Sequence, residues 1–337
     1  MHLNAVSRPG RWLFTLLLIL PLLAQAADAL PSWNASASRD AIVAFVEAVT
    51  DEKGKDYVPV AERIAVFDND GTLWSEQPMY FQVLFALAEV KRLAPQHPEW
   101  KTQQPFKAVL EDDQKTLAAS GMQGLMQIVT ATHTGISTDT FSQNARRWLA
   151  SSKHPRSQKP YTEMVFQPML ELLAYLRANG FKTYIVSGGE VAFMRTFAEE
   201  VYGIPPEQVI GTTFATRFQD QDGTLSIQRL AQLTHNDDGP GKPESIEAYI
   251  GRRPILAFGN SDGDMQMLQW TMAGEGRRLA GLVHHTDAQR EWAYDRQSQV
   301  GRLDKALDQA RDKGWVIVDM AKAWKQVYPF DQDASQH

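Results

Sequence analysis

Short apolar runs alternate along this sequence with longer stretches in which apolar residues recur every three or four positions. Residues 64–67 read Ile-Ala-Val-Phe, and residues 183–186 and 255–258 are similarly short and rich in strand-forming side chains. A run that does not alternate with polar residues is typical of a strand buried on both faces, as in a parallel sheet. Residues 279–283 and 316–318 have the same pattern. The sequence therefore predicts a set of buried, mostly parallel strands.

Amphipathic helices are predicted between these runs, and residues 77–164 show helical spacing with no strand-like run. Pro168 suits the first position of one helix and Gly180 its end. Pro243 similarly suits a first helical position and is expected to leave Lys242 just outside the helix. The predicted helices cover residues 41–49, 79–93, 106–119, 124–132, 137–149, 168–179 and 303–313, with two more starting near residues 190 and 244.

Alternating strands and helices predict an α/β fold with a Rossmann-like, mostly parallel sheet. Residues 212–218 and 224–227 flank a polar turn at residues 219–223 and predict an added hairpin. The expected organisation is a core made of residues 61–76 and 165–330, interrupted by a helical insert, with a helical segment before it and a polar tail after it. The helical insert is residues 77–164, the helical segment before the core is residues 27–60, and the polar tail is residues 331–337.

The N-terminus resembles a secretory leader. Arg8 and Arg11 precede an apolar run at residues 12–23, which is too short to span a bilayer, and Ala-Gln-Ala follows at residues 24–26. We expect cleavage after residue 26, a soluble periplasmic protein and no stable membrane association; the alternative is an uncleaved anchor. The chain has no cysteine, which excludes disulfides, thiol nucleophiles and Cys-ligated metals.

The formal net charge of −6 becomes more negative when Arg8 and Arg11 are removed with the leader. Nucleic-acid binding depends on neutralising phosphates with Lys and Arg, so an acidic surface argues against a nucleic-acid partner. A small phosphate ester would also be repelled overall. Such a substrate would need a metal ion and one or two placed cations at its site.

Two carboxylates, Asp68 and Asp70, directly follow the first predicted strand, and Gly71 and Thr72 then turn the chain. Carboxylates this close are not both comfortably ionised without a cation or a shared proton. The carboxyl end of a buried strand is where open α/β sheets bind ligands. The alternative is an acidic, solvated loop.

Three further segments carry candidate chemistry. Ser187, Gly188 and Gly189 follow the second predicted strand and precede a helix start, which suits an anion because backbone amides point at the ligand there. Lys242 stands before another predicted helix. The last segment, residues 259–265, reads Gly-Asn-Ser-Asp-Gly-Asp-Met after a strand. Its oxygen-bearing side chains suit a hard cation such as Mg²⁺.

Together these segments resemble the four motifs of the haloacid dehalogenase superfamily in its phosphatase branch. Residues 68–73, Asp-Asn-Asp-Gly-Thr-Leu, resemble the first motif, and Ser187 and Lys242 match the second and third in order. Residues 259–264 resemble the fourth, usually G-D-x-x-x-D, but Asn260 stands where that pattern has its first Asp. A helical insert after the first motif resembles the C1 cap of this superfamily, and the hairpin resembles the phosphoserine phosphatase group.

The resemblance implies a role for each matched residue. Asp68 would be the nucleophile that becomes a phosphoaspartate, and Asp70 the general acid and base. Ser187 and Lys242 would hold the phosphoryl oxygens. The implied Mg²⁺ ligands are Asp68, the backbone oxygen of Asp70, Asn260 and Asp264, with Asp262 as an alternative. The expected substrate-binding residues are Thr72, Glu76, Gly188 and Gly189.

The implied activity is Mg²⁺-dependent hydrolysis of a small phosphomonoester, with phosphoserine as one option. Glu76 would meet a substrate amine and Arg146 or Arg147 a carboxylate, although all three also suit ordinary surface positions. His284, His285 and Asp287 follow the strand at residues 279–283, so we expect them either to face the ligand crevice, touching substrate or supporting residues that do, or to serve packing and the surface. Two other functions stay open: a phosphotransferase using the same intermediate, and a non-catalytic periplasmic binding protein with a degenerate site.

Overall fold

The computed structural model describes residue 2 and residues 30–331. The predicted leader, apart from residue 2, and the tail after residue 331 lie outside the described residues. None of the described helices is long and apolar enough to cross a membrane.

Within residues 30–331, seven strands form one sheet in the order β4-β3-β2-β1-β5-β6-β7. All neighbouring pairs are parallel except β3 and β4, which form an antiparallel hairpin. The predicted α/β, mostly parallel fold is confirmed. The strands are β1 (Ile64–Phe67), β2 (Lys182–Glu190), β3 (Val209–Gln221), β4 (Thr224–His235), β5 (Leu256–Gly259), β6 (Leu279–His284) and β7 (Val316–Asp319).

Two apolar layers enclose the central strand β1, because its successive side chains point to opposite faces. Ala65 and Phe67 pack in one core cluster with residues of α1 (Ala37–Thr50) and α7 (Gln167–Ala178). Ile64 and Val66 pack in the other, whose helical members come from η6 (Ile246–Ile250), α11 (Met265–Met272) and α12 (Lys305–Lys313). Burial on both faces explains the unbroken apolar run in the sequence.

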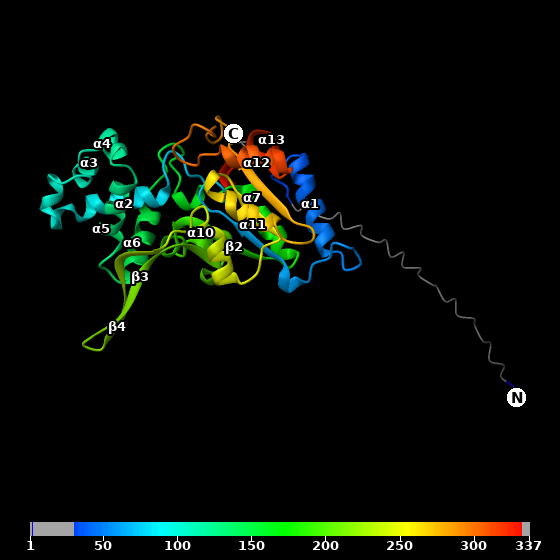
Figure 1. Ribbon diagram of the computed structural model, residues 1–337, viewed down its shortest axis with the longest axis horizontal. Helices are drawn as coiled ribbons and strands as arrows, with labels where there is room; N and C mark the ends of the chain where they lie inside the picture. Colours follow the sequence, from blue (N-terminus) through cyan, green and yellow to red (C-terminus); the bar gives the residue numbers. More distant parts are fainter. Residues whose placement is uncertain (1, 3–29, 332–337) are drawn as a thin grey trace.

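A group of helices lies at one end of the molecule, beyond the hairpin side of the sheet (Figure 1). It has an apolar cluster of its own, which includes Val90, Trp100 and Ile128. The five α-helices of this stretch are α2 (Phe81–Leu93), α3 (Phe106–Leu110), α4 (Gln114–Ala119), α5 (Gly121–His133) and α6 (Thr138–Ser151). The division into core and insert stays a prediction.

Two predicted helices differ from the structure. The helix expected at residues 106–119 is broken at Asp112, which has a positive φ of 54°, and Asp113 then caps α4 by accepting from Thr116 N. The prediction that Pro243 begins a helix and leaves Lys242 outside is also wrong. Helix α10 begins at Gly241 and runs to Ser245, so Lys242 lies in its first turn.

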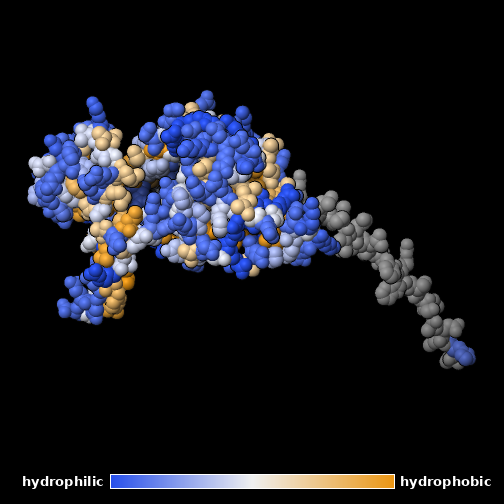
Figure 2. Space-filling model, in the orientation of Figure 1, coloured by the Kyte–Doolittle hydropathy of each residue, from blue (hydrophilic) through white to orange (hydrophobic). Residues whose placement is uncertain are grey.

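The hairpin is longer and its turn tighter than expected. Only Asp222 and Gly223 separate β3 from β4, and both have positive φ, as a two-residue turn of this kind requires. The hairpin projects from the sheet (Figure 1), and hydrophobic surface lies along it (Figure 2). Its apolar side chains Phe218, Leu225 and Ile227 are exposed. The remaining short helices are α8 (Val191–Met194), α9 (Ala198–Tyr202) and α13 (Met320–Ala323).

Candidate active site

Lys242 contacts three neighbouring strands or the loops that follow them, β1, β2 and β5. Its Nζ lies 2.6 Å from Asp68 Oδ1 at the end of β1 and 2.6 Å from Asp264 Oδ1 beyond β5. It also donates to the carbonyl of Val186 in β2 at 3.0 Å. The side chain is fully enclosed, and all three ammonium protons have acceptors. The first turn of α10 therefore holds the cation where β1 and β5 end, beside the middle of β2.

The site contains more buried acid than Lys242 neutralises. Burial raises the pKa of Asp68, and the nearby Asp264 carboxylate raises it further, against the attraction of Lys242. Burial raises the pKa of Glu76 well above its usual value, and the nearby Asp70 and Asp68 carboxylates raise it further, against the hydrogen bond from Tyr294. Lys242 stays protonated, since the two contacting carboxylates outweigh its burial and raise its pKa. An added cation would relieve this excess negative charge.

Asp70 is poised for proton transfer. Enclosure raises its pKa to about 6, and the hydrogen bond from Trp74 Nε1 to its Oδ1, at 2.7 Å, opposes part of the rise. A carboxyl group with a pKa near the working pH both donates and accepts protons effectively. The tight turn after it depends on Gly71, whose φ of 72° disfavours other residues.

The glycine loop after β2 faces these acids. Ser187 is buried, and its Oγ accepts from Gly189 N at 3.2 Å. A Cβ atom on Gly189 would lie 3.6 Å from Asp70 Oδ2, so this loop and the first loop approach each other closely. The expected helix start after Gly189 is only the single turn of α8, and β2 itself continues to Glu190. Gly188 lies beside Asp238 and is exposed.

Asn260 is held between two residues of the first loop. Its Oδ1 accepts from Thr72 Oγ1 at 3.1 Å, and its Nδ2 donates to Glu76 Oε1 at 2.7 Å. An amide nitrogen only donates, so Glu76 Oε1 is the acceptor in this contact, as it is toward the Tyr294 hydroxyl. The structure thus places Thr72 and Glu76, which were expected to bind substrate, on Asn260 inside the site.

The two neighbouring acids of this segment have structural contacts. Asp264 Oδ2 accepts from the backbone amides of Asn260 and Ser261 and from Ser261 Oγ, which closes the loop after β5. Asp262 Oδ1 accepts from Asp304 N and Ala306 N, so it caps the start of α12. Asp262 therefore serves the fold. Among the described residues, no group of three or more His, Cys, Asp or Glu side chains is placed to hold a metal ion.

The end of β6 and the long loop after it contribute Tyr294, which sequence patterns did not identify, as well as His284 and His285, which they did. Tyr294 donates from its hydroxyl to Glu76 Oε1 at 2.8 Å and stacks on His285, with ring centroids 4.4 Å apart. His285 donates from Nε2 to the carbonyl of Gly71 at 2.8 Å, which supports the turn of the first loop. His284 instead pairs with Asp295 at 3.4 Å. No short-range signal could have placed Tyr294 beside Glu76, because the pairing spans most of the chain.

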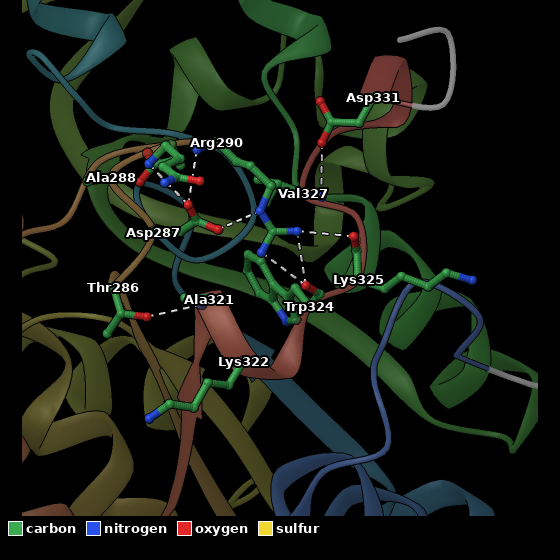
Figure 3. A network of polar contacts seen from close by, with 12 residues as sticks. Thr286, Asp287, Ala288, Arg290, Ala321, Lys322, Trp324, Lys325, Val327 and Asp331 are labelled. Carbon is green, nitrogen blue, oxygen red and sulfur yellow. Dashed lines mark hydrogen bonds and ion pairs between the residues drawn. The ribbon is translucent and has the colours of Figure 1, made fainter. Parts of the chain in front are cut away.

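Arg290 anchors that loop away from the site (Figure 3). It pairs with Asp287 and donates to the carbonyls of Trp324 and Lys325. The Asp287 carboxylate also accepts from backbone amides of its own turn, so Asp287 is structural.

A second buried ionic cluster surrounds Glu190, the residue that follows the glycine loop. We call Glu190, His133 and Arg229 the Glu190 cluster. Glu190 pairs with Arg229 of β4 and with His133 Nδ1 of α5, the latter at 3.1 Å. Its backbone amide donates to Gln82 Oε1 of α2 at 2.8 Å. The cluster therefore ties the helices of the insert and the hairpin to the residue that ends the glycine loop. Neither Arg146 nor Arg147 is part of it.

These features, a parallel sheet with paired acids, a glycine loop and a lysine at one edge, define an α/β enzyme with a site at its strand ends. The family profile described as haloacid dehalogenase-like hydrolase matches residues 65–269, which is more than half of the chain. The chain belongs to this family of hydrolases, and the predicted superfamily and enzyme class are confirmed. No curated protein matches the sequence.

The chain is similar to several solved structures. A conserved protein of unknown function from Anaerococcus prevotii DSM 20548 is 17% identical, with a TM-score of 0.51 over 85% of this chain and 91% of that one. A protein of unknown function from Bordetella pertussis Tohama I is 14% identical, with a TM-score of 0.48 over 77% and 99%. A phosphoserine phosphohydrolase-like protein from Francisella tularensis subsp. tularensis SCHU S4 is 16% identical, with a TM-score of 0.37 over 66% and 87%.

Proposed function

We propose that the protein is a Mg²⁺-dependent phosphatase that hydrolyses a small phosphomonoester through a phosphoaspartate. The observation that carries the proposal is the arrangement at the end of β1. A buried Asp68 carboxylate is paired with Lys242, and a second carboxyl group, Asp70, has a pKa near 6. A nucleophile and an acid–base group side by side suit displacement at phosphorus.

The chain's own residues account for the proton and bond changes. Asp68 attacks phosphorus, and the bond to the ester oxygen breaks while Asp70 gives that oxygen its proton. Asp70, now ionised, takes a proton from water, which attacks the phosphoaspartate and releases inorganic phosphate and free Asp68. Ser187 and the amides of its loop bind phosphoryl oxygens. The three ammonium protons of Lys242 already have acceptors, so we assign Lys242 to offsetting the charge of Asp68 rather than to binding phosphoryl oxygens.

The donor set fits Mg²⁺. The Asp68 carboxylate, the backbone oxygen of Asp70 and the Asn260 side-chain oxygen are hard oxygen donors of the kind this cation takes. The surplus of buried carboxylates supplies the negative charge. We assign these three as ligands and Asp264 as the support that holds Asn260. When bound, Mg²⁺ would neutralise phosphoryl charge.

The substrate class is a small phosphomonoester, with phosphoserine among the candidates. Glu76 is 2% exposed and its Oε1 already accepts from Asn260 and Tyr294, so its burial inside the site separates it from a substrate amine. The helices of residues 77–164 would cover the site as a cap, because the Glu190 cluster joins them to the glycine loop. The leader pattern supports a periplasmic location.

A panel of phosphomonoesters tests the proposal. Purified protein should release phosphate in the presence of Mg²⁺ and not after chelation, and Asp68→Asn should be inactive. An added alcohol acceptor separates hydrolysis from transfer, because a transferase would form a new ester. Binding of esters without any turnover by the wild type would overturn the proposed activity.

A further inference from the structure

We propose that Glu76 is a positioning residue that supplies, from the first loop, the carboxylate charge absent at position 260. This inference rests on the proposed Mg²⁺-dependent function. The fourth segment carries a neutral amide at Asn260, yet the side chain in direct contact with that amide is an acid. The carboxyl group thus stands one hydrogen bond away from the position where the motif resembled by residues 259–264 has its first acid.

Hydrogen bonds fix which way Asn260 points. Glu76 Oε1 can only accept from the amide nitrogen, at 2.7 Å, and so directs the amide oxygen away from itself. Thr72 Oγ1 donates to that oxygen at 3.1 Å, which leaves one lone pair of Oδ1 for a cation. Replacing the Glu76 carboxylate by a group that both donates and accepts would remove this constraint. Asn260 could then present nitrogen where oxygen is needed.

The backbone is shaped to admit Glu76. A Cβ atom on Gly71 would lie 2.4 Å from Glu76 Oε1 and 2.0 Å from Asn260 Nδ2, and one on Gly301 would lie 1.8 Å from Glu76 Oε1. Both glycines also have positive φ, of 72° and 64°. Two distant turns therefore expose bare backbone to the same carboxylate, which is the behaviour of a built site rather than of an acid trapped by chance.

The loop after β6 holds Glu76 in place from its other side. Tyr294 donates to Glu76 Oε1 at 2.8 Å, and Gly301 N donates to Tyr80 Oη at 3.1 Å, which fixes the turn around Gly301. Within residues 30–331, Glu76 Oε2 accepts no hydrogen bond, whereas Oε1 accepts two. The carboxylate is thus aimed by one oxygen and keeps acceptor capacity on the other.

The inference is tested by exchanging the charge between positions 76 and 260 and measuring the affinity for Mg²⁺. The affinity is measured by calorimetry on the full-length protein without substrate. Glu76→Gln keeps the shape and removes the charge, so Kd for Mg²⁺ should rise by about tenfold or more. In Glu76→Gln/Asn260→Asp the amide donates to the new carboxylate, and Kd should return to within about threefold of wild type. Glu89→Gln, which alters a buried acid paired with Arg92, should leave Kd unchanged.

The outcomes separate this inference from the proposed function. If wild type binds Mg²⁺ and Glu76→Gln binds it equally well, the role of Glu76 is overturned while the phosphatase proposal stands. If the double variant binds as weakly as Glu76→Gln, with unchanged thermal stability, charge exchange is refuted. Wild-type protein that hydrolyses esters but binds no Mg²⁺ would overturn the metal site itself.

Asn260→Asp decides the matter if Glu76→Gln does not fold. It places two carboxylates in contact, so the metal-free protein should have a lower Tm than wild type, and Mg²⁺ should raise that Tm by more than it raises the wild-type Tm. An unchanged metal-free Tm together with an unchanged Mg²⁺ response would refute the contact between position 260 and the Glu76 charge.

Discussion

Arg229→Met should destabilise the protein strongly, although Arg229 lies outside the reacting groups. Arg229 is 3% exposed, pairs with Glu190 and donates from Nε to the carbonyl of His133 at 2.6 Å. Removing one partner of a buried pair leaves an uncompensated charge, which typically costs about 3–5 kcal/mol. Methionine keeps the apolar packing over Phe141, and Glu190 retains His133, so we expect a loss near the lower end, about 3 kcal/mol.

The assay is urea unfolding at several pH values, with Lys91→Met as the control. Lys91 pairs with Asp112 at an exposed position, so that variant should lose under about 1 kcal/mol. Despite its burial, Glu190 has a lowered pKa because His133 and Arg229 stabilise its charge. A lowered folded-state pKa gives stability that is present above the usual value of 4.5 and lost as the pH falls through the folded-state value.

The difference in free energy of unfolding between wild type and Arg229→Met should therefore be largest at neutral pH and become smaller in acid. The double variant Glu190→Gln/Arg229→Met should recover part of the loss, because both buried charges are gone. The reasoning is refuted if Arg229→Met costs no more than Lys91→Met at neutral pH, or if its cost grows as the pH is lowered below 4.5.

Three further changes probe the site. Asp70→Asn should slow phosphorylation much less with nitrophenyl phosphate than with an alkyl phosphate, since a good leaving group needs little protonation; equal losses in rapid mixing would exclude Asp70 as the acid. Gly71→Ala should weaken Mg²⁺ binding in calorimetry, because its Cβ would lie 2.0 Å from Asn260 Nδ2; wild-type affinity would contradict this. Trp74→Phe removes the hydrogen bond that lowers the Asp70 pKa, so the alkaline limb of the kcat/KM pH profile, where Asp70 loses the proton it donates, should move to higher pH; an unmoved limb would contradict this.

Local patterns sufficed for the sheet because each core strand is buried on both faces and reads as a short apolar run. The strand at residues 64–67 and its neighbours were placed to within a few residues for this reason. The order of the motifs also identified Lys242, although its helix begins earlier than Pro243 suggested. The kink at Asp112 was missed because a single residue with positive φ leaves no periodic signal.

Contacts between distant segments could not be read from the sequence. The sequence suggested that Glu76 binds substrate. Its partners in the structure, Asn260 and Tyr294, belong to loops after other strands, so spacing along the chain could not reveal them. Glu190 carried no signal at all, since its meaning depends on an arginine in the hairpin and a histidine in α5. Spatial proximity created by the sheet order, rather than spacing along the chain, determines these roles.

The most direct test of the central claim is to trap the phosphorylated enzyme. Asp70→Asn protein mixed with nitrophenyl phosphate and Mg²⁺ should accumulate the intermediate, because no base activates water for its hydrolysis. After an acid quench, mass spectrometry should find one phosphoryl group on the peptide containing Asp68, and none in Asp68→Asn/Asp70→Asn. Nitrophenol release without phosphorylation of Asp68, or a phosphoryl group on another residue, would contradict the covalent mechanism.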